Sequence, residues 1–255
     1  MKQFTVDKLL VKAFETRKEM GEVSAKDISE KFKELLAKKE TINVIFAAAP
    51  SQNDVLASLV ADKSIEWGRI NAFHMDEYVG LSPDAPQGFG NFLKEKIFGK
   101  VPFKSVNYIN PAAKDAEKEA ERYGKIIKEN APDVVVMGIG ENGHIAFNDP
   151  PVADFKDKKA AKVVTLDEVC RNQQVHDGCF KDISLVPTHA ITLTVPSLAD
   201  APYQFCIVPA KTKAKAVFNT LNGEIGEKVP ATVLRTCDNA ILYLDGDSSS
   251  ELSIW

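Results

Sequence analysis

The sequence predicts a single α/β domain over residues 1–255, in which helices cover both faces of a Rossmann-like, mostly parallel sheet. Three observations predict this fold. Short apolar runs rich in β-branched residues recur along the chain, and segments with helical spacing of apolar residues separate several of them. The length of 255 residues suits one large domain, and no repeat, low-complexity tract or linker divides it.

The strands are expected where apolar, β-branched residues cluster. The strongest run is APDVVVMGIG, and the full set covers 41–49, 69–75, 131–140, 161–166, 189–195, 203–210 and 239–245. Helical spacing predicts an amphipathic helix over 23–40 with Ser24 as its N-cap. Four more helices are expected, at 53–62, 88–98, 113–129 and 212–222. The stretch 245–255 has the composition of a loop-like tail.

Composition excludes several classes of function. The formal net charge is −4 and no basic tract is interleaved with aromatic residues, so we expect no nucleic-acid partner. No secretory signal and no run of about 18 apolar residues is present, which predicts a cytoplasmic protein without a membrane span. The four cysteines match neither a zinc ligand set nor a redox pair and are expected to be reduced thiols.

A glycine-rich segment, GIGENGHIAFNDPP (138–151), follows the strongest strand. Its first six residues fit the G-x-G-x-x-G pattern of dinucleotide-binding proteins. That pattern needs a long helix opening at its third glycine, so that the helix N-terminus faces the pyrophosphate. Pro150 and Pro151 follow Gly143 too closely for such a helix. The segment therefore argues against a dinucleotide site.

His144 in this segment is a candidate general acid or base. It follows the carboxyl end of a predicted strand, where α/β folds bind ligands, and glycines including Gly140 allow the backbone to approach a ligand closely. Asp149 lies five residues further on and could orient the imidazole. The alternative is a structural histidine in a tight loop.

The segment HMDEYVGL (74–81) places two carboxylates, Asp76 and Glu77, directly after another predicted strand. A carboxylate at that position can remove a proton next to a carbonyl group if its surroundings raise its pKa. A solvated turn is the alternative for such a pair. We expect His74 to be structural. A metal site of His74, Asp76 and Glu77 stays open but lacks a further ligand cluster.

These two segments carry a family resemblance. FHMDEYVGL and GIGENGHIAFNDP resemble the two signature motifs of the glucosamine-6-phosphate deaminase/isomerase family in order and spacing, and the likeness extends from about residue 20 to 245. The related 6-phosphogluconolactonases share the glycine-rich strand end, but their sequence after the histidine differs. The resemblance implies isomerising deamination of an amino-sugar phosphate, namely glucosamine 6-phosphate to fructose 6-phosphate and ammonia, without a metal or organic cofactor.

The resemblance also implies roles for individual residues. Asp76 matches the base that removes the C2 proton of the open-chain sugar, and His144 matches the residue that opens the pyranose ring. Asp149 stands where the family usually has a glutamate partnering this histidine. Asn142 stands where members have aspartate or asparagine. Aspartate is one methylene shorter than glutamate, so the structure must show whether Asp149 still reaches His144.

The resemblance is weaker at the phosphate end. The turn after the first predicted strand is AAAPSQND (47–54), where most family members have glycine and threonine. Ser51, Gln52 and Asn53 can still donate hydrogen bonds at the start of a helix that favours an anion. Lys213 matches the family's phosphate-binding lysine. His176 is nearest to the place of an arginine that the sequence lacks.

Three further functions stay open at this stage. Hydrolysis of a sugar-phosphate lactone would need His144 but no base at Asp76. The sequence also allows an isomerase for a different or unphosphorylated amino sugar, and a non-catalytic sugar-phosphate sensor. The expected partner is a small-molecule amino-sugar phosphate, in a possible homo-oligomer. Some relatives are activated at a subunit interface, and Val152, Ala153 and Val164 here replace groups that would hold that effector.

Overall fold

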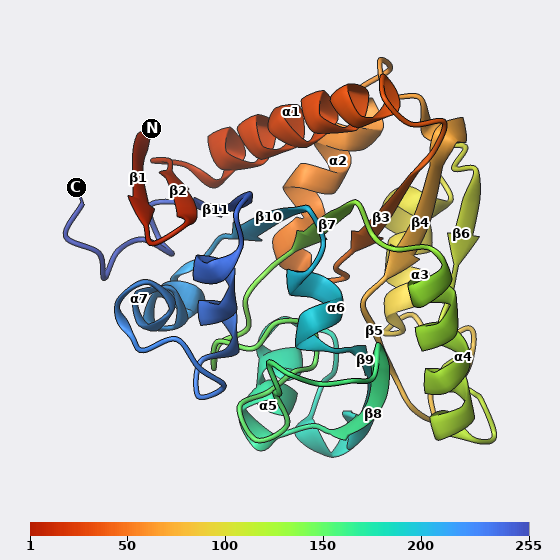
Figure 1. Cartoon of the computed structure of the whole chain (residues 1–255). Helices are drawn as coiled ribbons and strands as arrows, with labels where there is room; N and C mark the ends of the chain where they lie inside the picture. The colour runs from red at the N-terminus through yellow and green to blue at the C-terminus, as the bar shows by residue number, and fades with distance from the viewer. Residues whose placement is uncertain (255) are drawn as a thin grey trace.

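The computed structural model describes residues 1–254, which form one large sheet with helices on both faces and a second, small sheet (Figure 1). The large sheet has the order β1 (Lys2–Val6), β2 (Leu9–Ala13), β11 (Ala240–Leu244), β10 (Tyr203–Val208), β7 (Val134–Met137), β3 (Ile42–Phe46), β4 (Ile70–His74) and β6 (Ser105–Asn107). Every neighbouring pair is parallel except β1 with β2. The predicted α/β fold with a mostly parallel sheet is confirmed.

Seven α-helices surround the sheet in the described residues. They are α1 (Arg17–Leu36), α2 (Asn53–Ala61), α3 (Phe89–Leu93, continued by a π-helical turn over Lys94–Phe98), α4 (Ala116–Glu129), α5 (Glu168–His176), α6 (Val195–Ala199) and α7 (Ala214–Asn222). Short 3-10 turns occur at Pro50–Gln52, Trp67–Arg69, Ile183–Leu185, Lys211–Lys213 and Pro230–Thr236. No described helix is long and apolar enough to cross a bilayer.

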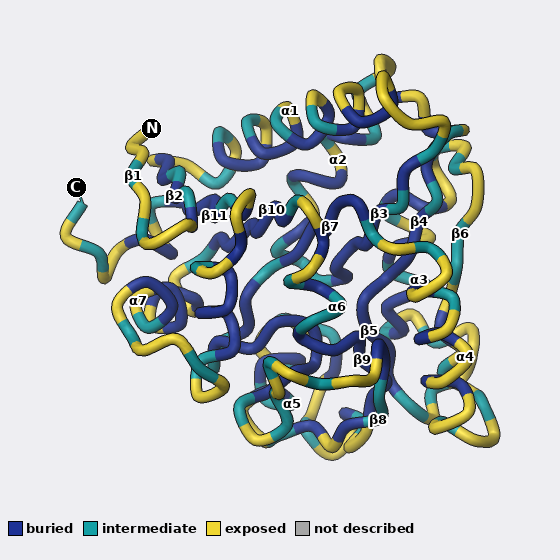
Figure 2. Tube along the Cα trace, viewed as in Figure 1, coloured by how far each residue is buried: buried dark blue, intermediate teal, exposed yellow. Residues whose placement is uncertain are grey.

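Two hydrophobic cores lie on opposite faces of the large sheet. Side chains alternate along β7, so Val134 and Val136 pack with α1, α2 and α3, while Val135 and Met137 pack with α4, α6 and α7. Because both faces of the parallel strands are covered, those strands are continuously apolar in sequence. Figure 2 shows the buried strands enclosed by helices whose outer surfaces are exposed.

Three expectations about the elements are wrong. The helix expected over 23–40 begins at Arg17, where Thr16 is the N-cap and accepts a hydrogen bond from the amide of Glu19. Ser24 is buried inside α1, and its hydroxyl donates to the carbonyl of Gly21. The residues before α1, where no strand was expected, form the β1–β2 hairpin, which extends the sheet beyond β11.

The third error concerns the strands over 161–166 and 189–195. They do not join the large sheet. They form a small antiparallel sheet of β5 (Asp76–Tyr78), β9 (His189–Leu193) and β8 (Ala161–Thr165). The chain passes from β4 to β5 through the single residue Met75, whose carbonyl accepts the amide hydrogen of Leu193. The small sheet therefore continues from the carboxyl end of β4. The tail is described to Ile254 and has no helix or strand, while Trp255 lies outside the described residues.

The order of the large sheet fixes where a ligand can bind. From β3 the chain adds β4 and β6 on one side, and then β7, β10 and β11 on the other. Adjacent strands β3 and β7 therefore send their connections in opposite directions. Such a switch of direction opens a crevice at the carboxyl ends of the strands, which is the common binding position in open α/β sheets.

Candidate active site

A cavity of about 370 Å³ lies at this crevice. Its wall comes from the segments that follow β3, β4 and β7, from the end of α5, and from the turn before α7. The lining includes six of the ten residues expected to act on substrate: Ser51, Gln52, Asp76, Gly140, His144 and Lys213. The volume is within the range of small-molecule sites.

His144 and Asp149 form a buried pair. The Nδ1 atom of His144 lies 2.9 Å from Oδ1 of Asp149, so the shorter aspartate still reaches the imidazole. Burial alone would raise the pKa of Asp149, but the hydrogen bond and charge of His144 and the amide of Asn142 bring that pKa below its ordinary value. The carboxylate is therefore ionised beside the histidine at neutral pH.

Asn142 fixes the orientation of the same ring. Its Oδ1 accepts the backbone amide hydrogen of His144 at 3.0 Å and lies 2.7 Å from Nδ1. Its amide nitrogen donates to Asp149 at 3.0 Å and to Asp167 at 3.2 Å. Because both neighbours of Nδ1 are oxygen acceptors, the neutral imidazole carries its proton on Nδ1. Nε2 is then left with a lone pair for proton transfer.

The loop that holds His144 is not a dinucleotide motif. Residues 138–160 contain no helix, as the two prolines predict. The loop closes on itself, because the amide of Gly140 donates to the carbonyl of His144 at 2.9 Å. Gly143 has a φ of +84° and lies so close to Val229 that a Cβ there would be 2.7 Å from a valine methyl carbon.

Asp76 lines the same cavity, at the start of β5. Its residue exposure is only 6%, and within residues 1–254 its side chain makes no hydrogen bond or ion pair. Burial, together with the charges of Glu77 and Asp149, raises the pKa of Asp76 well above its ordinary value. A carboxylate held in such surroundings is a stronger base than an exposed one, which suits removal of a carbon-bound proton.

Glu77 and His74 lie near Asp76 in the sequence, but their side chains bind backbone amides of the protein. Glu77 accepts the amide hydrogens of Tyr78, Phe89 and Gly90, and so ties β5 to the start of α3. His74 is fully buried, and its Nε2 accepts the amide hydrogen of Ile109 at 2.9 Å. Burial lowers the pKa of His74 to about 4, so its ring is neutral.

The phosphate end of the cavity centres on Lys213. Its side chain is buried, and no hydrogen bond or ion pair to its ammonium forms within the described chain. Burial lowers its pKa, while the charges of Asp177 and Glu141 oppose that shift. Gln52 is also buried and donates to Ser51 and to the carbonyl of Ile207. A buried cation beside hydroxyl and amide donors can bind an anion.

Two of the expected substrate contacts do not reach the cavity. Asn53 is exposed on α2, and His176 is exposed at the end of α5, where its Nδ1 lies 3.3 Å from a carboxylate oxygen of Glu141. Neither residue lines the cavity. Asn53 is turned away because the 3-10 turn over Pro50–Gln52 directs Ser51 and Gln52 inward and starts α2 behind them.

Sequence reasoning missed a wall of the cavity. The lining includes five residues at the end of α5 and just after it: Gln173, Gln174, Asp177, Gly178 and Cys179. Gln174 accepts the hydroxyl hydrogen of Tyr78 at 2.7 Å, and Gln173 accepts the amide hydrogen of Glu141 at 2.7 Å. One residue in the sequence could have indicated the start of α5. Asp167 is a typical N-cap, and its side chain accepts the amide hydrogen of Cys170.

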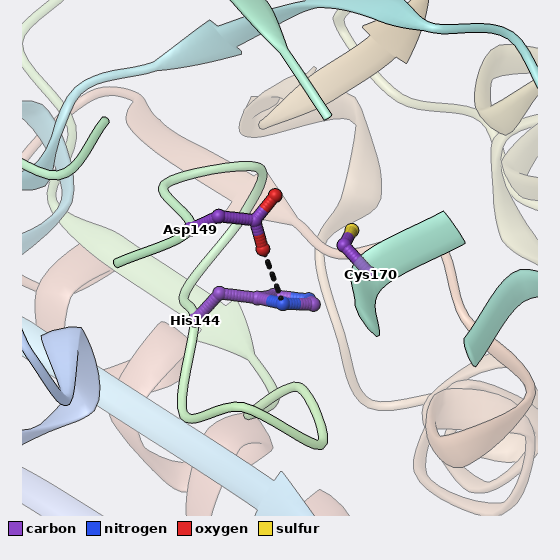
Figure 3. A group of neighbouring side chains, drawn as sticks. All are labelled: His144, Asp149 and Cys170. Atoms are coloured by element: carbon purple, nitrogen blue, oxygen red, sulfur yellow. Dashed lines mark ion pairs between the residues drawn. The ribbon is translucent and has the colours of Figure 1, made fainter. Parts of the chain in front are cut away.

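His74, Asp76 and Glu77, considered above as a possible metal site, are not the possible ligands that the structure groups together. Within residues 1–254, the group of possible ligands brought together is His144, Asp149 and Cys170. All three are buried. Figure 3 draws their side chains.

Comparison with known proteins places the chain in one family. Residues 15–243 match the sequence profile of the family described as glucosamine-6-phosphate isomerases/6-phosphogluconolactonase. Glucosamine-6-phosphate deaminase from Bacillus cereus (strain G9842) is 33% identical over 235 residues, which are 92% of this chain and 86% of that protein. The Streptococcus sanguinis (strain SK36) deaminase is 28% identical over 93% of this chain and 97% of its own length.

Solved structures give the same picture. A monomeric glucosamine-6-phosphate deaminase superposes with a TM-score of 0.85 at 27% identity, covering 94% of this chain and 98% of that one. A 6-phosphogluconolactonase from Thermotoga maritima has a TM-score of 0.75 at 20% identity over 93% of this chain and all of that one, which shows a shared fold.

Proposed function

The chain belongs to the glucosamine-6-phosphate isomerase/6-phosphogluconolactonase family, and on that basis we propose that it converts glucosamine 6-phosphate to fructose 6-phosphate and ammonia. The observation that carries the proposal is the presence, in one cavity, of two groups: the buried carboxylate of Asp76, which has no hydrogen-bond or ion-pair partner within residues 1–254, and His144, which is linked to a carboxylate. A lactone hydrolase has no use for the first of these groups.

The proposed reaction is a sequence of proton transfers. Nε2 of His144 accepts the proton of the sugar's anomeric hydroxyl group and passes it to the ring oxygen, and the bond between C1 and the ring oxygen breaks to open the pyranose. Asp76 removes the proton at C2, which gives an enolamine. Proton return at C1 gives a 2-imino sugar, and water hydrolyses it to the ketose phosphate and ammonia. Asp149 and Asn142 hold the imidazole in the tautomer that this sequence needs.

A substrate panel tests the proposal. Glucosamine 6-phosphate, galactosamine 6-phosphate, N-acetylglucosamine 6-phosphate, free glucosamine and 6-phosphogluconolactone are assayed for release of ammonia and of acid. We expect ammonia and fructose 6-phosphate from glucosamine 6-phosphate in preference to the others. Acid release from the lactone without ammonia from any amino sugar would contradict the proposal.

Lys213→Ala tests the phosphate end of the cavity. Loss of a buried, charge-assisted bond costs about 1.5–3 kcal/mol, so KM for the phosphorylated substrate should rise about 10- to 100-fold. KM for the unphosphorylated sugar should change little. Lys211→Ala is the matched control, because Lys211 is exposed, donates to Ser250 and does not line the cavity. Equal effects on both substrates would mean that Lys213 does not bind phosphate.

The steady-state kinetics should be hyperbolic and indifferent to N-acetylglucosamine 6-phosphate. Val152 and Ala153 have no side-chain hydrogen-bonding groups. The cation of Lys162 is occupied, since it pairs with Asp157 at 2.9 Å and donates to the carbonyl of Val152 at 2.7 Å. Saturation curves with and without the effector provide the measurement. Sigmoidal saturation that becomes hyperbolic on addition of the effector would overturn this prediction.

We also propose a cytoplasmic location. The four cysteines are all free thiols in the structure, and three of them are buried, which suits a reducing compartment. Assembly into a homo-oligomer stays a prediction, for which light scattering of the purified protein is the measurement.

A further inference from the structure

A cluster of possible metal ligands lies behind the candidate catalytic histidine. One donor atom each from His144, Asp149 and Cys170 lies within 4.8 Å of the other two. His144 and Asp149 come from the loop after β7, whereas Cys170 lies in the first turn of α5. Figure 3 shows the sulfur atom of Cys170 beside the linked histidine and aspartate. None of these side chains is more than one tenth exposed.

The donor set matches the preferences of one class of cation. Imidazole nitrogen, carboxylate oxygen and thiolate sulfur are the ligands of Zn²⁺ and of its analogues Co²⁺ and Cd²⁺. Tetrahedral zinc holds such donors roughly 3.3–3.8 Å apart, given its bond lengths of about 2.0–2.3 Å. The distance of 2.9 Å between His144 Nδ1 and Asp149 Oδ1, now bridged by a proton, needs to widen by only a few tenths of an ångström. Asn142 Oδ1, 2.7 Å from the same nitrogen, is a fourth donor.

We propose that His144, Asp149 and Cys170 form an inhibitory site for a thiophilic divalent cation, with Zn²⁺ as the natural candidate. The effect on turnover rests on the function proposed above, whereas the binding does not. On binding, the thiol of Cys170 releases its proton to solvent. The metal takes the place of the Nδ1 proton of His144, and that proton moves to Nε2. The lone pair that accepts the substrate's hydroxyl proton is then absent.

The site predicts the form of the inhibition. His144 lines the cavity, but Asp149 and Cys170 do not. The metal therefore lies on the side of the imidazole that faces away from the substrate. Substrate and metal can bind together, so the metal should lower kcat and leave KM nearly unchanged. Saturating substrate should not relieve the inhibition.

Direct binding is tested with Co²⁺, whose thiolate complexes absorb in the near ultraviolet. The wild-type chain should develop a sulfur-to-metal charge-transfer band on titration with Co²⁺, and Zn²⁺ should remove it by displacement. Cys170→Ala and Cys170→Ser should not develop the band. Cys206→Ala is the matched control, because Cys206 is an equally buried thiol in β10 and away from the cluster. This measurement needs no substrate, so it stands apart from the outcome of the substrate panel.

Turnover is then measured over a Zn²⁺ series, with chelator added at the end to restore activity. Both Cys170 variants should keep basal turnover within about twofold and need at least about tenfold more Zn²⁺ for half inhibition. The proposal is overturned if both variants are inhibited like the wild type. Relief of inhibition by substrate would also overturn it, as would loss of inhibition in Cys179→Ala alone, since Cys179 lines the cavity.

Discussion

Asp76→Asn is expected to lower turnover by about 10²-fold or more and to stop exchange of the substrate's C2 proton with solvent. The amide keeps the shape of the carboxyl group but cannot accept the proton. Because Asp76 makes no hydrogen bond or ion pair within the described chain, the substitution breaks no such interaction. KM should change little, because the loss falls on a step after binding.

The same substitution should make the folded protein more stable at neutral pH. Burial raises the pKa of Asp76 in the native state above the value of 3.8 expected for an unfolded chain. The native state therefore binds more protons than the unfolded state between those two values. Stability falls as pH rises through that interval, and the full cost of the buried charge remains above it. Asparagine has no charge and avoids this cost.

Thermal unfolding of both proteins between pH 4 and 8 provides the measurement. Tm of Asp76→Asn should exceed that of the wild type at pH 7–8, and the difference should shrink towards pH 4. Asp84→Asn is the control, since Asp84 is exposed on the loop after β5 and should change neither turnover nor Tm. Normal proton exchange in Asp76→Asn would remove Asp76 from the reaction.

Much of the fold could be predicted because the strongest signals come from buried parallel strands. Runs such as VVVM of β7 must be apolar on both faces, so they are visible without any alignment. The partners of β8 and β9 could not be predicted. Their sequences specify strands, but pairing with β5 depends on Met75, where the chain leaves the large sheet after β4 and enters the small one as β5. The alternation of apolar and polar side chains does not determine which strand pairs with which.

Part of the candidate site could be predicted from the sequence, and part could not. His144 and Asp76 were predictable because each directly follows a strand, and the carboxyl ends of parallel strands meet at one edge. The wall from α5 was not, since its polar residues, among them Gln173 and Gln174, resemble an ordinary solvated helix face. Gln174 contacts Tyr78, nearly one hundred residues earlier in the chain, and Gln173 contacts the amide of Glu141. No local pattern encodes these contacts.

Gly140→Ala is expected to lower kcat about 10²-fold, although it adds a single methyl group. A Cβ built on Gly140 would lie 2.1–2.3 Å from the Cε1, Nε2 and Nδ1 atoms of His144, far inside any real contact. The loop cannot simply move away, because hydrogen bonds hold it: Gly140 donates to the carbonyl of His144 and accepts from Gly143. The imidazole must therefore leave Asn142 and Asp149.

The decrease in kcat of Gly140→Ala should arise only from displacement of the His144 side chain. His144→Ala removes the same ring and is expected to cost a similar factor of about 10². In the double variant the added methyl group finds no imidazole to displace, so its turnover should match that of His144→Ala instead of falling by the product of the two effects. Gly226→Ala is the matched control, since a Cβ there has no atom within 4 Å and the residue's φ is not positive.

Stability separates this effect from general damage to the fold. Overpacking costs about 1–3 kcal/mol, which corresponds to a Tm decrease of about 2–12 °C for a domain of this size. Gly140→Ala should therefore remain folded at assay temperature, and the double variant should recover part of the lost Tm because the clash is gone. Full additivity in turnover, with no recovery of Tm, would mean that Gly140 acts on the reaction by a route other than the position of His144.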